Sequence, residues 1–565
     1  MSSPLYNIAS SGLKAAQIAL ATTSNNISNA YVDGYNLQRV TLSKAQQSGA
    51  LGNGVTGISR AYDSLVVGQL RAASTSAAAA STYSDNISQI DNLLSDSDTD
   101  LSTQMSTFFA SLQALSSAAS DSAARQTVIG SGQNLVSQFS SLDNTLRDMD
   151  SAIDSQLSAT ADQINTYAKQ IATLNAQIAR QCTGSESNAL LDQRDQLVNS
   201  LNQLVGVNVT VQDDSTLSLT IGSGLTLVQG SSAYSLAVVP SSADASQMAL
   251  AYDRGNGTLS EIDPATLTGG SLGGMLSFRD GALADARNQL GQIALAFADS
   301  FNQQHQAGVD LNGDAGGDFF TLGSPTVVSN TRNSGSAVLS VAFADSTAVK
   351  ASDYMAKYTA DGWQITRNSD GASVAYTSAT DESGATVLSF EGLNLSVSDS
   401  PSVNDSYQLK TVSNVIQGLS VAITDPALIA AGQADDESGD GDNRNAEALL
   451  ALQNTKLVGG SATLSTAYAS LVSKVGTQTS NAKITAETQA SMVSQLTEKQ
   501  RSISGVNLDE EYVDLQRYQQ YYQANSKVMT TAGTIFDAWL TPSLPVCHAV
   551  RGNHHAPEHQ YDLPA

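Results

Sequence analysis

The segment Asp310-Leu-Asn312-Gly-Asp314 places three oxygen-bearing side chains at alternate positions, as the first half of a calcium-binding loop does. Such a loop continues with a glycine and a bidentate glutamate, and this chain has Ala315 and Thr321 at those two places. Glycine and aspartate are also the residues that tight turns favour. We therefore interpret the segment as a Gly/Asp-rich turn and predict no metal site in it.

The tail after Leu540 gathers side chains that zinc prefers. They are Cys547, His548, His554, His555 and His559. Their spacing fits no closed four-ligand site, and the tail is interrupted by prolines and has no apolar periodicity. We predict that residues 541–565 are disordered and bind no metal. The second cysteine, Cys182, is far away in sequence, which excludes a disulfide scaffold.

Residues that could support catalysis lack the context that catalysis needs. Serines are abundant, but no Gly-x-Ser-x-Gly elbow stands between a strand and a helix, and no histidine is placed to activate one. The glycines of Gly222-Ser-Gly224 lie between two predicted strands rather than before a helix, so they do not form a phosphate-binding loop. We predict that the chain is not an enzyme and has no catalytic residue or cofactor.

Two groups of charged residues have simpler interpretations than a catalytic site. Asp509-Glu510-Glu511 begins a predicted helix, where carboxylates are favoured by the positive end of the helix dipole. Asp192, Arg194 and Asp195 are interpreted as a solvated or intersubunit ion-pair face.

Both ends of the chain carry apolar residues at the three- and four-residue steps of a coiled coil. Near the start these positions are Tyr6, Ala9, Leu13, Ala16, Leu20, Thr23 and Ile27. Near the end they are Leu508, Tyr512, Leu515, Tyr522, Met529, Phe536 and Leu540, with Gln519, Ser526 and Gly533 between them. Because small and polar residues dilute both rows, we expect each helix to be stable only with a partner. Such ends are typical of a subunit that orders on assembly.

The middle of the chain alternates between two periods. A seven-residue repeat predicts a long helix from Leu135 to Ile178, and further helices are predicted at Asn188–Leu204, Leu272–His305 and Asn445–Leu540. Alternation in twos predicts strands at 207–221 and again between about 319 and 409. We therefore predict an α+β multidomain protein, in which a discontinuous bundle of long helices built from both termini carries inserted, mainly β domains.

Composition excludes several classes of partner. Among 565 residues, 27 Lys and Arg face 53 Asp and Glu, giving a net charge of −26, which opposes binding to nucleic acid or to anionic membranes. The chain starts without the basic and apolar pattern of a signal peptide, and no apolar stretch is long enough to span a bilayer. We expect a protein that is cytoplasmic or exported without a cleaved signal.

The first of these helices ends in a recognisable motif. Asn25-Asn26-Ile27-Ser28-Asn29-Ala30, followed by Gly34-Tyr35, resembles the N-terminal signature shared by rod, hook and hook-associated subunits of the bacterial flagellum. Asparagine amides can cap the last carbonyls of a helix there, and Gly34 allows a positive φ. The chain has Tyr31-Val32-Asp33 where the signature usually has Asn-Thr-Pro.

Four further stretches resemble, within that superfamily, the family of hook-associated protein 1, the first of the two hook–filament junction proteins. They are Asn188–Asp195, Leu272–Asp280 with Phe301, Asn302, His305, Gly308 and Asp310, Gly441–Ala446, and Ser504–Glu511 with Tyr518 and Gln519. The resemblance covers most of the chain in the right order and is looser between 319 and 409.

The resemblance implies a structural subunit that is secreted through the flagellar type III pathway and forms a ring between hook and filament outside the cell. The implied partners are further copies of the chain, the hook protein, the second junction protein and a dedicated export chaperone on the C-terminal helix. Two alternatives stay open. One is a hook or distal-rod subunit, and the other is a secreted enzyme or adhesin that its helical ends anchor in the flagellum.

Pattern and resemblance together predict four parts. They are a terminal helical polymerisation domain (1–45 with 505–540), a helical rod domain (46–205 with 268–318 and 433–504), a β-rich outer region (206–267 and 319–432) and the tail (541–565). The predicted polymer interface consists of Leu13, Leu20, Asn25, Asn26, Ile27, Asn29, Gly34, Tyr35, Val506, Leu508, Leu515, Tyr522, Met529 and Phe536.

Overall fold

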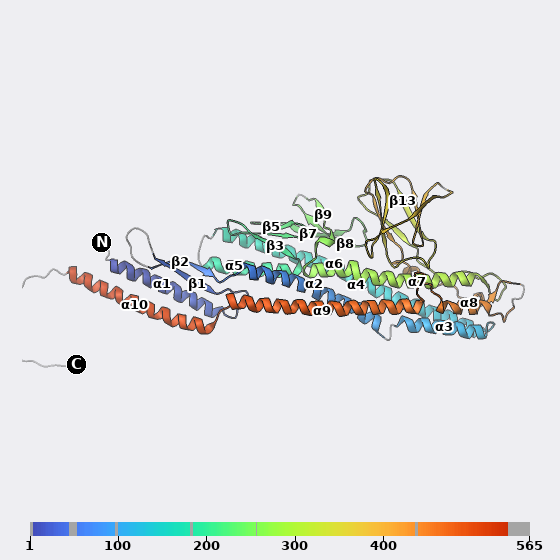
Figure 1. The fold of residues 1–565 in the computed structure, drawn as a ribbon, viewed down its shortest axis with the longest axis horizontal. Helices are drawn as coiled ribbons and strands as arrows, with labels where there is room; N and C mark the ends of the chain where they lie inside the picture. The colour runs from blue at the N-terminus through green and yellow to red at the C-terminus, as the bar shows by residue number, and fades with distance from the viewer. Residues whose placement is uncertain are drawn as a thin grey trace, which may run out of the picture. The chain divides into compact units, whose positions relative to one another are not determined.

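The computed structural model describes residues 4–44, 53–96, 100–180, 185–255, 257–382, 384–435 and 439–540. The chain divides into two compact units. Unit 1 comprises Met1–Tyr62, Thr183–Ala189 and Ile503–Ala565, and unit 2 comprises Asp63–Cys182 and Leu190–Ser502. Figure 1 traces the chain through both.

Unit 1 joins the two ends of the chain. Helix α1 (Pro4–Ser28) packs along α10 (Leu508–Leu540), and a hairpin of strands β1 (Gln38–Lys44) and β2 (Asn53–Arg60) packs on α1 (Figure 1). The helices run antiparallel, because Asn26 near the end of α1 hydrogen-bonds to Glu511 near the start of α10.

The helical framework of unit 2 consists mainly of long helices. They are α2 (Ser64–Ser95), α3 (Leu101–Ser117), α4 (Ser122–Arg180), most of α5 (Ser185–Leu204), α6 (Gly270–Ser277), α7 (Ala284–Gln306), α8 (Arg444–Ala451) and α9 (Leu464–Ser504), which ends at the boundary with unit 1. A π-helical segment (Phe278–Leu283) joins α6 to α7. Short 3₁₀ turns occur at Pro264–Thr266, Ile416–Gly418, Pro426–Leu428 and Leu452–Asn454. Together with the inserted sheets, this framework confirms the predicted fold class.

Two of these helices begin earlier than the apolar spacing predicts. The 59-residue α4 starts at Ser122, where the Asp121 carboxylate accepts the N–H groups of Ala123 and Ala124. Likewise α2 starts at Ser64, capped by Asp63, and its alanine-rich first half carries no helical apolar period. That half packs against α6, and a Cβ atom on Gly274 would lie 2.4 Å from the carbonyl oxygen of Ala79. Close approach of two backbones fixes this part of α2, and an apolar row is not needed.

The first insert (207–261) lies between α5 and α6 in the chain. Its strands are β3 (Val207–Val211), β4 (Leu217–Ile221), β5 (Leu225–Gln229), β6 (Ser232–Ala233), β7 (Ser235–Pro240), β8 (Met248–Asp253) and β9 (Leu259–Glu261). They form two antiparallel sheets in strand order β3–β4–β5–β6 and β7–β8–β9. Both sheets pack on α4 through β5, β6 and β7.

The second insert (320–421) lies between α7 and α8 in the chain. Its strands are β11 (Phe320–Thr321), β12 (Thr326–Ser329), β13 (Val338–Phe343), β14 (Tyr354–Thr359), β15 (Gly362–Arg367), β16 (Ser373–Val374), β17 (Thr377–Thr380), β18 (Thr386–Phe390), β19 (Leu393–Ser398), β20 (Ser406–Lys410) and β21 (Ser420–Val421). Its main sheets have the orders β12–β20–β14–β15–β16 and β13–β19–β18–β17. Two-stranded pairs β11–β21 and β10–β22 (Gly308–Val309 and Gly432–Gln433) lie where the chain leaves and rejoins the helices.

A cluster of phenylalanines lies where α3, α7 and β11 meet. Its members are Phe108, Phe109, Phe297, Phe301, Phe319 and Phe320, which are six of the 11 phenylalanines in the chain. Ring centroids lie 4.7 Å apart for Phe319 and Phe320 and 5.0 Å apart for Phe301 and Phe319. In a protein with 5% aromatic residues, this concentration makes one firm junction between the helices and the second insert.

The structure corrects the interpretation of the charged group in α5. Arg194 is 4% exposed and donates hydrogen bonds to the side chain of Asn175 and to the carbonyl oxygen of Ser215. Asp195 forms an ion pair with Arg71 of α2 at 3.2 Å. The prediction of a solvated or intersubunit face is therefore wrong, because these groups connect α5 to other elements of unit 2.

Asparagines on helices repeatedly hold strands in place. In four cases a carboxamide both donates to the carbonyl oxygen and accepts from the N–H group of a single strand residue, as a neighbouring strand would. These four carboxamide clamps pair Asn26 with Gln38, Asn165 with Leu236, Asn175 with Leu217, and Asn302 with Phe320. Each clamp satisfies backbone groups at a strand that a helix could not otherwise pair.

We expect Asn175→Ala to open the clamp on β4. Asn175 is fully buried, and its removal leaves the N–H and carbonyl groups of Leu217 without these partners. The expected loss of local stability is about 2 kcal/mol, or roughly 30-fold faster amide hydrogen exchange in the peptide that contains Leu217. Asn134→Ala, at an exposed position of the same helix, is the matched control and should leave that exchange unchanged.

The buried His305, stacked on Phe301, must be neutral in the folded protein. Its Nε2 atom accepts the N–H of Ala430 at 2.9 Å, so the proton sits on Nδ1, which donates to the carbonyl oxygen of Gly317 at 2.7 Å. Burial lowers the pKa of His305. The unfolded chain therefore takes up a proton that the folded chain refuses.

The resulting prediction concerns stability in weak acid. Stabilisation by neutral His305 is complete above the unfolded pKa of about 6.5 and is lost as the pH falls below that value toward the folded pKa. We expect the melting temperature to fall between about pH 6.5 and pH 5, and to fall less in His305→Gln, which cannot titrate. Parallel melting curves for the two proteins over this range would contradict the assignment.

Candidate assembly surface in the terminal unit

In unit 1, α1 buries its small side chains. The buried residues of α1 are Ala9, Ala15, Ala16, Ala19, Thr22, Thr23 and Asn26. Gly12 belongs to the same face, because a Cβ atom there would lie 2.4 Å from Oδ1 of Asn525 on α10. The two helices can therefore approach closely, since little side-chain volume separates them.

The face of α10 that is turned from solvent also follows three- and four-residue steps. Its buried and half-buried residues include Glu511, Leu515, Tyr518, Tyr522, Asn525, Met529 and Ala532. Three of the predicted interface residues, Leu515, Tyr522 and Met529, lie on this face half-buried. Leu508 and Phe536 are 36% and 47% exposed.

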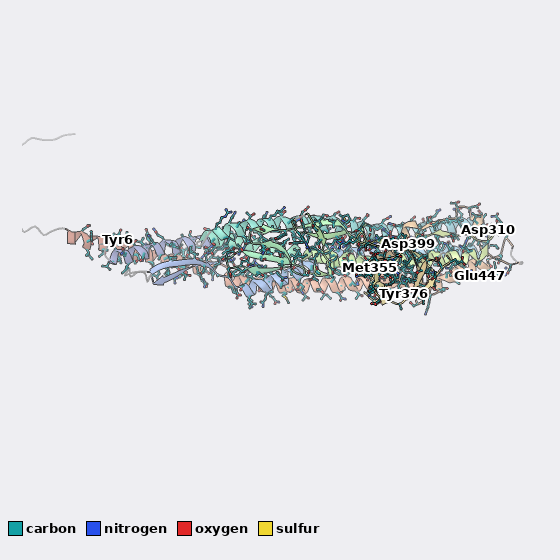
Figure 2. The ribbon with its side chains drawn as sticks, turned by 90° about the horizontal axis from the view of Figure 1, so that it is seen from above. Tyr6, Asp310, Met355, Tyr376, Asp399 and Glu447 are labelled. Carbon is teal, nitrogen blue, oxygen red and sulfur yellow. The ribbon has the colours of Figure 1, made fainter. Side chains whose placement is uncertain are left out.

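The larger apolar residues of α1 lie at the edge of this helix pair. Tyr6, near the start of α1 (Figure 2), is 45% exposed. The predicted interface residues Leu13, Leu20 and Ile27 are half-buried. The contact within the chain thus uses mainly the small residues and leaves the larger ones partly open to solvent.

Asn26 is the centre of a hydrogen-bond network at the end of α1. Besides clamping Gln38, its Nδ2 atom donates to Oε2 of Glu511 at 3.1 Å, and its Oδ1 atom accepts the hydroxyl of Tyr35 at 2.7 Å. Asn26 is 1% exposed, so these bonds are shielded from water. One side chain thereby ties together α1, the hairpin and α10.

The neighbouring motif residues shape the turn after α1. Asn29 donates from its amide to the carbonyl oxygen of Asn25 at 2.8 Å, which caps the last helical turn as the sequence indicates. Gly34 has a φ of 83°, a conformation that residues with a side chain rarely adopt. Asn25 and Gly34 are exposed, and Asn29 and Tyr35 are half-buried.

The chain enters α10 through a short turn that is fixed to the hairpin. The N–H of Leu37 donates to the carbonyl oxygen of Ser504 at 2.8 Å. Val506 is half-buried in this turn, and the side chain of Asn507 caps α10 by accepting the N–H of Asp509 at 3.1 Å.

Glu511 has a role that the helix dipole alone does not explain. Asp509 and Glu510 are exposed at the positive end of α10, as predicted, but Glu511 is 8% exposed and bonded to Asn26. Burial raises the pKa of Glu511, and the hydrogen bond from Asn26 opposes that rise. Nothing in the sequence distinguishes this carboxylate from its two neighbours.

A second apolar row on α10 was not recognised from the sequence. Val513, Tyr521, Val528 and Ile535 follow one another at steps of eight, seven and seven residues, which places them on one side of the helix. They are 63%, 52%, 41% and 56% exposed. We call these four residues the outer row. Its spacing was available from the sequence, but a neighbouring row of the same period masked it.

Charge is distributed unequally between the units. Unit 1 holds seven Lys or Arg and nine Asp or Glu, for a net charge of −2 in 132 residues. Unit 2 holds the remaining 20 and 44, for a net charge of −24. The acidity that the composition reveals is therefore concentrated in unit 2.

The calcium-like segment forms a turn that closes on itself. The carboxylate of Asp310 accepts the N–H groups of Asn312 and Asp314 at 2.7 and 3.0 Å, and Gly313 has a φ of 82°. Within the described ranges, no group of three potential metal-binding side chains comes together. Cys182, Cys547 and the histidine-rich tail lie outside those ranges.

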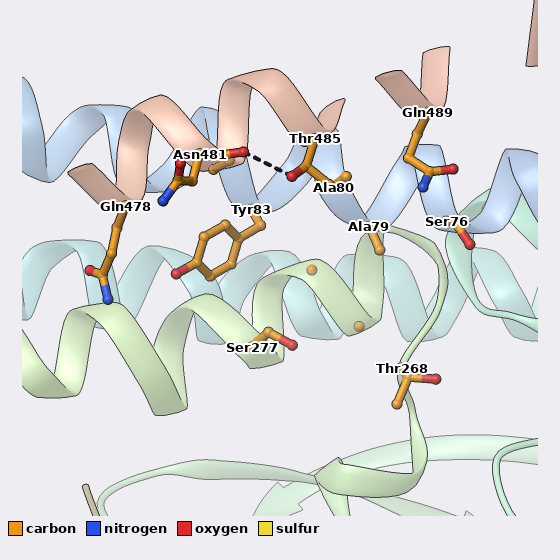
Figure 3. Close-up of a pocket in the computed structure, with 13 residues that line it drawn as sticks. Ser76, Ala79, Ala80, Tyr83, Thr268, Ser277, Gln478, Asn481, Thr485 and Gln489 are labelled. Carbon is orange, nitrogen blue, oxygen red and sulfur yellow. Dashed lines mark hydrogen bonds between the residues drawn. The ribbon is translucent and has the colours of Figure 1, made fainter. Parts of the chain in front are cut away.

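A groove of about 540 Å³ lies between α9 and the pair α2 and α6 in unit 2 (Figure 3). Glycine, alanine, serine, threonine, asparagine and glutamine line it, together with Tyr83. None of the lining residues is an acid, a base, a histidine or a cysteine, so the groove offers amides and hydroxyls but no nucleophile and base pair. In the part of the chain that the structure describes, no helix is long and apolar enough to cross a membrane.

We expect Asn26→Ala to loosen the hairpin from the two helices. It removes the clamp on Gln38 and leaves Glu511 buried without its amide partner. Trypsin cleavage after the exposed Arg39 should become about tenfold faster, which corresponds to about 1.4 kcal/mol of local stability. Asn25→Ala, next along the same helix but exposed, should leave the cleavage rate within about twofold of the parent protein.

Comparison with known families agrees with this architecture. The model described as "Flagellar hook-associated protein FlgK helical domain" matches residues 87–320, and that described as "Flagellar hook-associated protein 1, D2-like domain" matches residues 328–411. The ends of the chain match "Flagella basal body rod protein" at residues 7–36 and "Flagellar basal body rod FlgEFG protein C-terminal" at residues 502–541.

Individual relatives cover nearly the whole chain. Flagellar hook-associated protein 1 of Escherichia coli (strain K12) is 49% identical over 548 residues, which is 95% of this chain and 99% of that protein. The protein of the same description from Salmonella typhimurium (strain LT2) is 48% identical over 554 residues, with the same coverage. The solved structure of the flagellar hook junction protein FlgK from Burkholderia pseudomallei superposes with a TM-score of 0.72 at 29% identity, covering 77% of this chain and all of that one. The chain therefore belongs to the flagellar hook-associated protein 1 family.

Proposed function

We propose that unit 1 is the part through which copies of this chain polymerise. The chain is a structural subunit of the bacterial flagellum at the junction between hook and filament, outside the cell. The observation that carries the polymerisation proposal is the outer row of α10, four apolar side chains on one helix face that no element of unit 1 covers. Apolar faces of this kind gain stability when another helix covers them.

The packing inside unit 1 supports the same proposal. Small residues form most of the contact of α1 with its neighbours, and the larger residues Leu13, Leu20 and Ile27 remain partly open at its edge. A subunit that used its large residues internally would have little left to offer a neighbour. We propose the fourteen residues of the predicted polymer interface, with the outer row added, as the contact set.

The distribution of charge supports it as well. Packing identical copies side by side is opposed by like charges, and unit 1 carries a net charge of only −2. The strongly acidic unit 2 would resist such close packing. We therefore propose that the terminal polymerisation domain corresponds to unit 1, which also includes the β1–β2 hairpin held by Asn26.

The remaining division of the chain is proposed as the sequence predicts it. The rod domain would comprise 46–205 with 268–318 and 433–504, the outer β-rich region 206–267 and 319–432, and the tail 541–565. Within unit 1 the hairpin residues beyond 45 extend the terminal domain at the expense of the rod domain.

The finer partners belong to the same proposal. We infer that the chain forms a ring with its own copies, contacts the hook protein on one side and the second junction protein on the other, and has no catalytic activity. The exposed apolar side chains of α10 also suit a dedicated export chaperone, which would cover them before assembly.

Replacing the outer row tests the polymerisation proposal. In the variant with Val513, Tyr521, Val528 and Ile535 all changed to serine, no buried contact is lost, so melting temperature and circular dichroism should stay close to the parent values. In cells that lack their own hook-associated protein 1, this variant should fail to restore filaments, as seen by electron microscopy and by loss of swimming.

The matched control changes polar residues of the same helix. Gln516→Ser with Gln523→Ser alters two exposed positions of α10 and should restore normal filaments. Normal filament growth with the quadruple serine variant would sink the proposed role of the outer row.

A further inference from the structure

We propose that an ionic latch holds the two β-rich inserts of unit 2 together and sets their relative orientation. Its acidic half is Asp244 and Glu261 of the first insert, and its basic half is Lys410 and Arg332 of the second. Each half carries one sign of charge. The two inserts are separated in the chain by α6 and α7, so nothing in their sequence order requires them to meet.

The inner ion pair of the latch is well shielded from water. Nζ of Lys410, at the end of β20, lies 2.6 Å from Oδ2 of Asp244 and 2.8 Å from the hydroxyl of Ser246, both in the loop between β7 and β8. The side chains of Lys410 and Asp244 are 20% and 8% exposed. Burial opposes ionisation of Asp244, but the hydrogen bonds from Lys410 and Ser246 hold the pKa of that carboxyl below its usual range.

The outer ion pair is reinforced by the backbone. Arg332 lies 2.7 Å from Oε2 of Glu261, and the hydroxyl of Ser242 donates to the same carboxylate. Beside them the N–H of Thr331 donates to the carbonyl oxygen of Ser242 at 2.9 Å. One loop of the first insert, Ser241 to Gln247, is thereby joined to both ends of the latch.

Each insert is attached to the helices independently of the latch. The first insert is held on α4 by the clamps of Asn165 and Asn175. The second is held by Arg147 of α4, which donates to the carbonyl oxygen of Ser413, and by Gln292 of α7, which donates to that of Val349. Opening the latch should therefore leave both inserts folded and in place on the helices.

The junction between the inserts is mainly polar. Among the described strands, none from the first insert packs extensively against one from the second. Ion pairs and hydrogen bonds thus replace the apolar packing that usually fixes two domains. Because salt screens charges but not apolar contacts, the orientation of the inserts should depend on ionic strength. In a joint of the flagellum, a reversible latch of this kind lets identical subunits adopt more than one arrangement of their outer parts.

The distance between the inserts measures the state of the latch. Spin labels at Thr210→Cys in the first insert and Ser378→Cys in the second occupy exposed positions, with Cys182 and Cys547 replaced by serine in the full chain. Double electron–electron resonance should give a narrow distance distribution at about 0.01 M salt and one at least twice as wide at about 1 M, where the screening length falls from about 30 Å to about 3 Å.

Variants separate the latch from a general effect of salt. Asp244→Asn with Lys410→Met should give the wide distribution at both salt concentrations, and Asp244→Lys with Lys410→Asp should restore the narrow one at low salt. Arg332→Gln, at a side chain that is 62% exposed, carries little risk of misfolding and should widen the distribution at low salt by itself. Lys357→Met with Asp361→Asn, at exposed positions of the second insert, is the matched control and should behave as the parent.

The outcomes decide the proposal in either direction. A distribution that stays narrow in Asp244→Asn with Lys410→Met and in Arg332→Gln would overturn the latch. So would a parent protein whose distribution does not change between the two salt concentrations. Circular dichroism of each variant confirms that the inserts remain folded, so that widening reports their orientation.

Discussion

The carboxamide clamp is the interaction on which this architecture depends. A long helix satisfies its own backbone, but the strands beside it carry N–H and carbonyl groups that must find partners once they are buried. Asn26, Asn165, Asn175 and Asn302 supply those partners from helices, each pairing with both backbone groups of one strand residue. The hairpin of unit 1 and the sheets of unit 2 are attached to helices by the same chemistry.

Around these attachments the chain places its few large side chains selectively. Six of 11 phenylalanines gather at the junction of α3, α7 and β11, whereas the contact between α1 and its neighbours relies on alanine, glycine and threonine. Unit 1 thus holds its helices together with small residues and keeps an apolar row for other copies. Its low net charge and the acidity of unit 2 serve the same division between a part that packs and a part that stays solvated.

Sequence patterns predicted the long α4, the strands of both inserts and the helical ends, because each has a clear apolar period. They failed where contact, rather than period, decides the structure. Asp192, Arg194 and Asp195 look like a solvated face, yet Arg194 is buried against Asn175 and the turn at Ser215. Glu511 looks like one of three acids at a helix start, yet it is bonded to Asn26, far away in the chain. Polar residues gave no warning of either contact, since charge and hydrogen-bonding capacity are the same on a surface and in a core.

The order of helices and strands, the membership of the two ends in one helical element and the flagellar motif after α1 were determined by the sequence itself. Local spacing is sufficient for these, because the period of apolar residues follows from the geometry of each element. Which residues of α1 touch α10, which row of α10 is left uncovered, and which strand each asparagine clamps were decided only by the tertiary structure. Those choices depend on how closely two backbones approach, and that distance is set by residues far apart in the chain, as the contact of Gly12 with Asn525 illustrates.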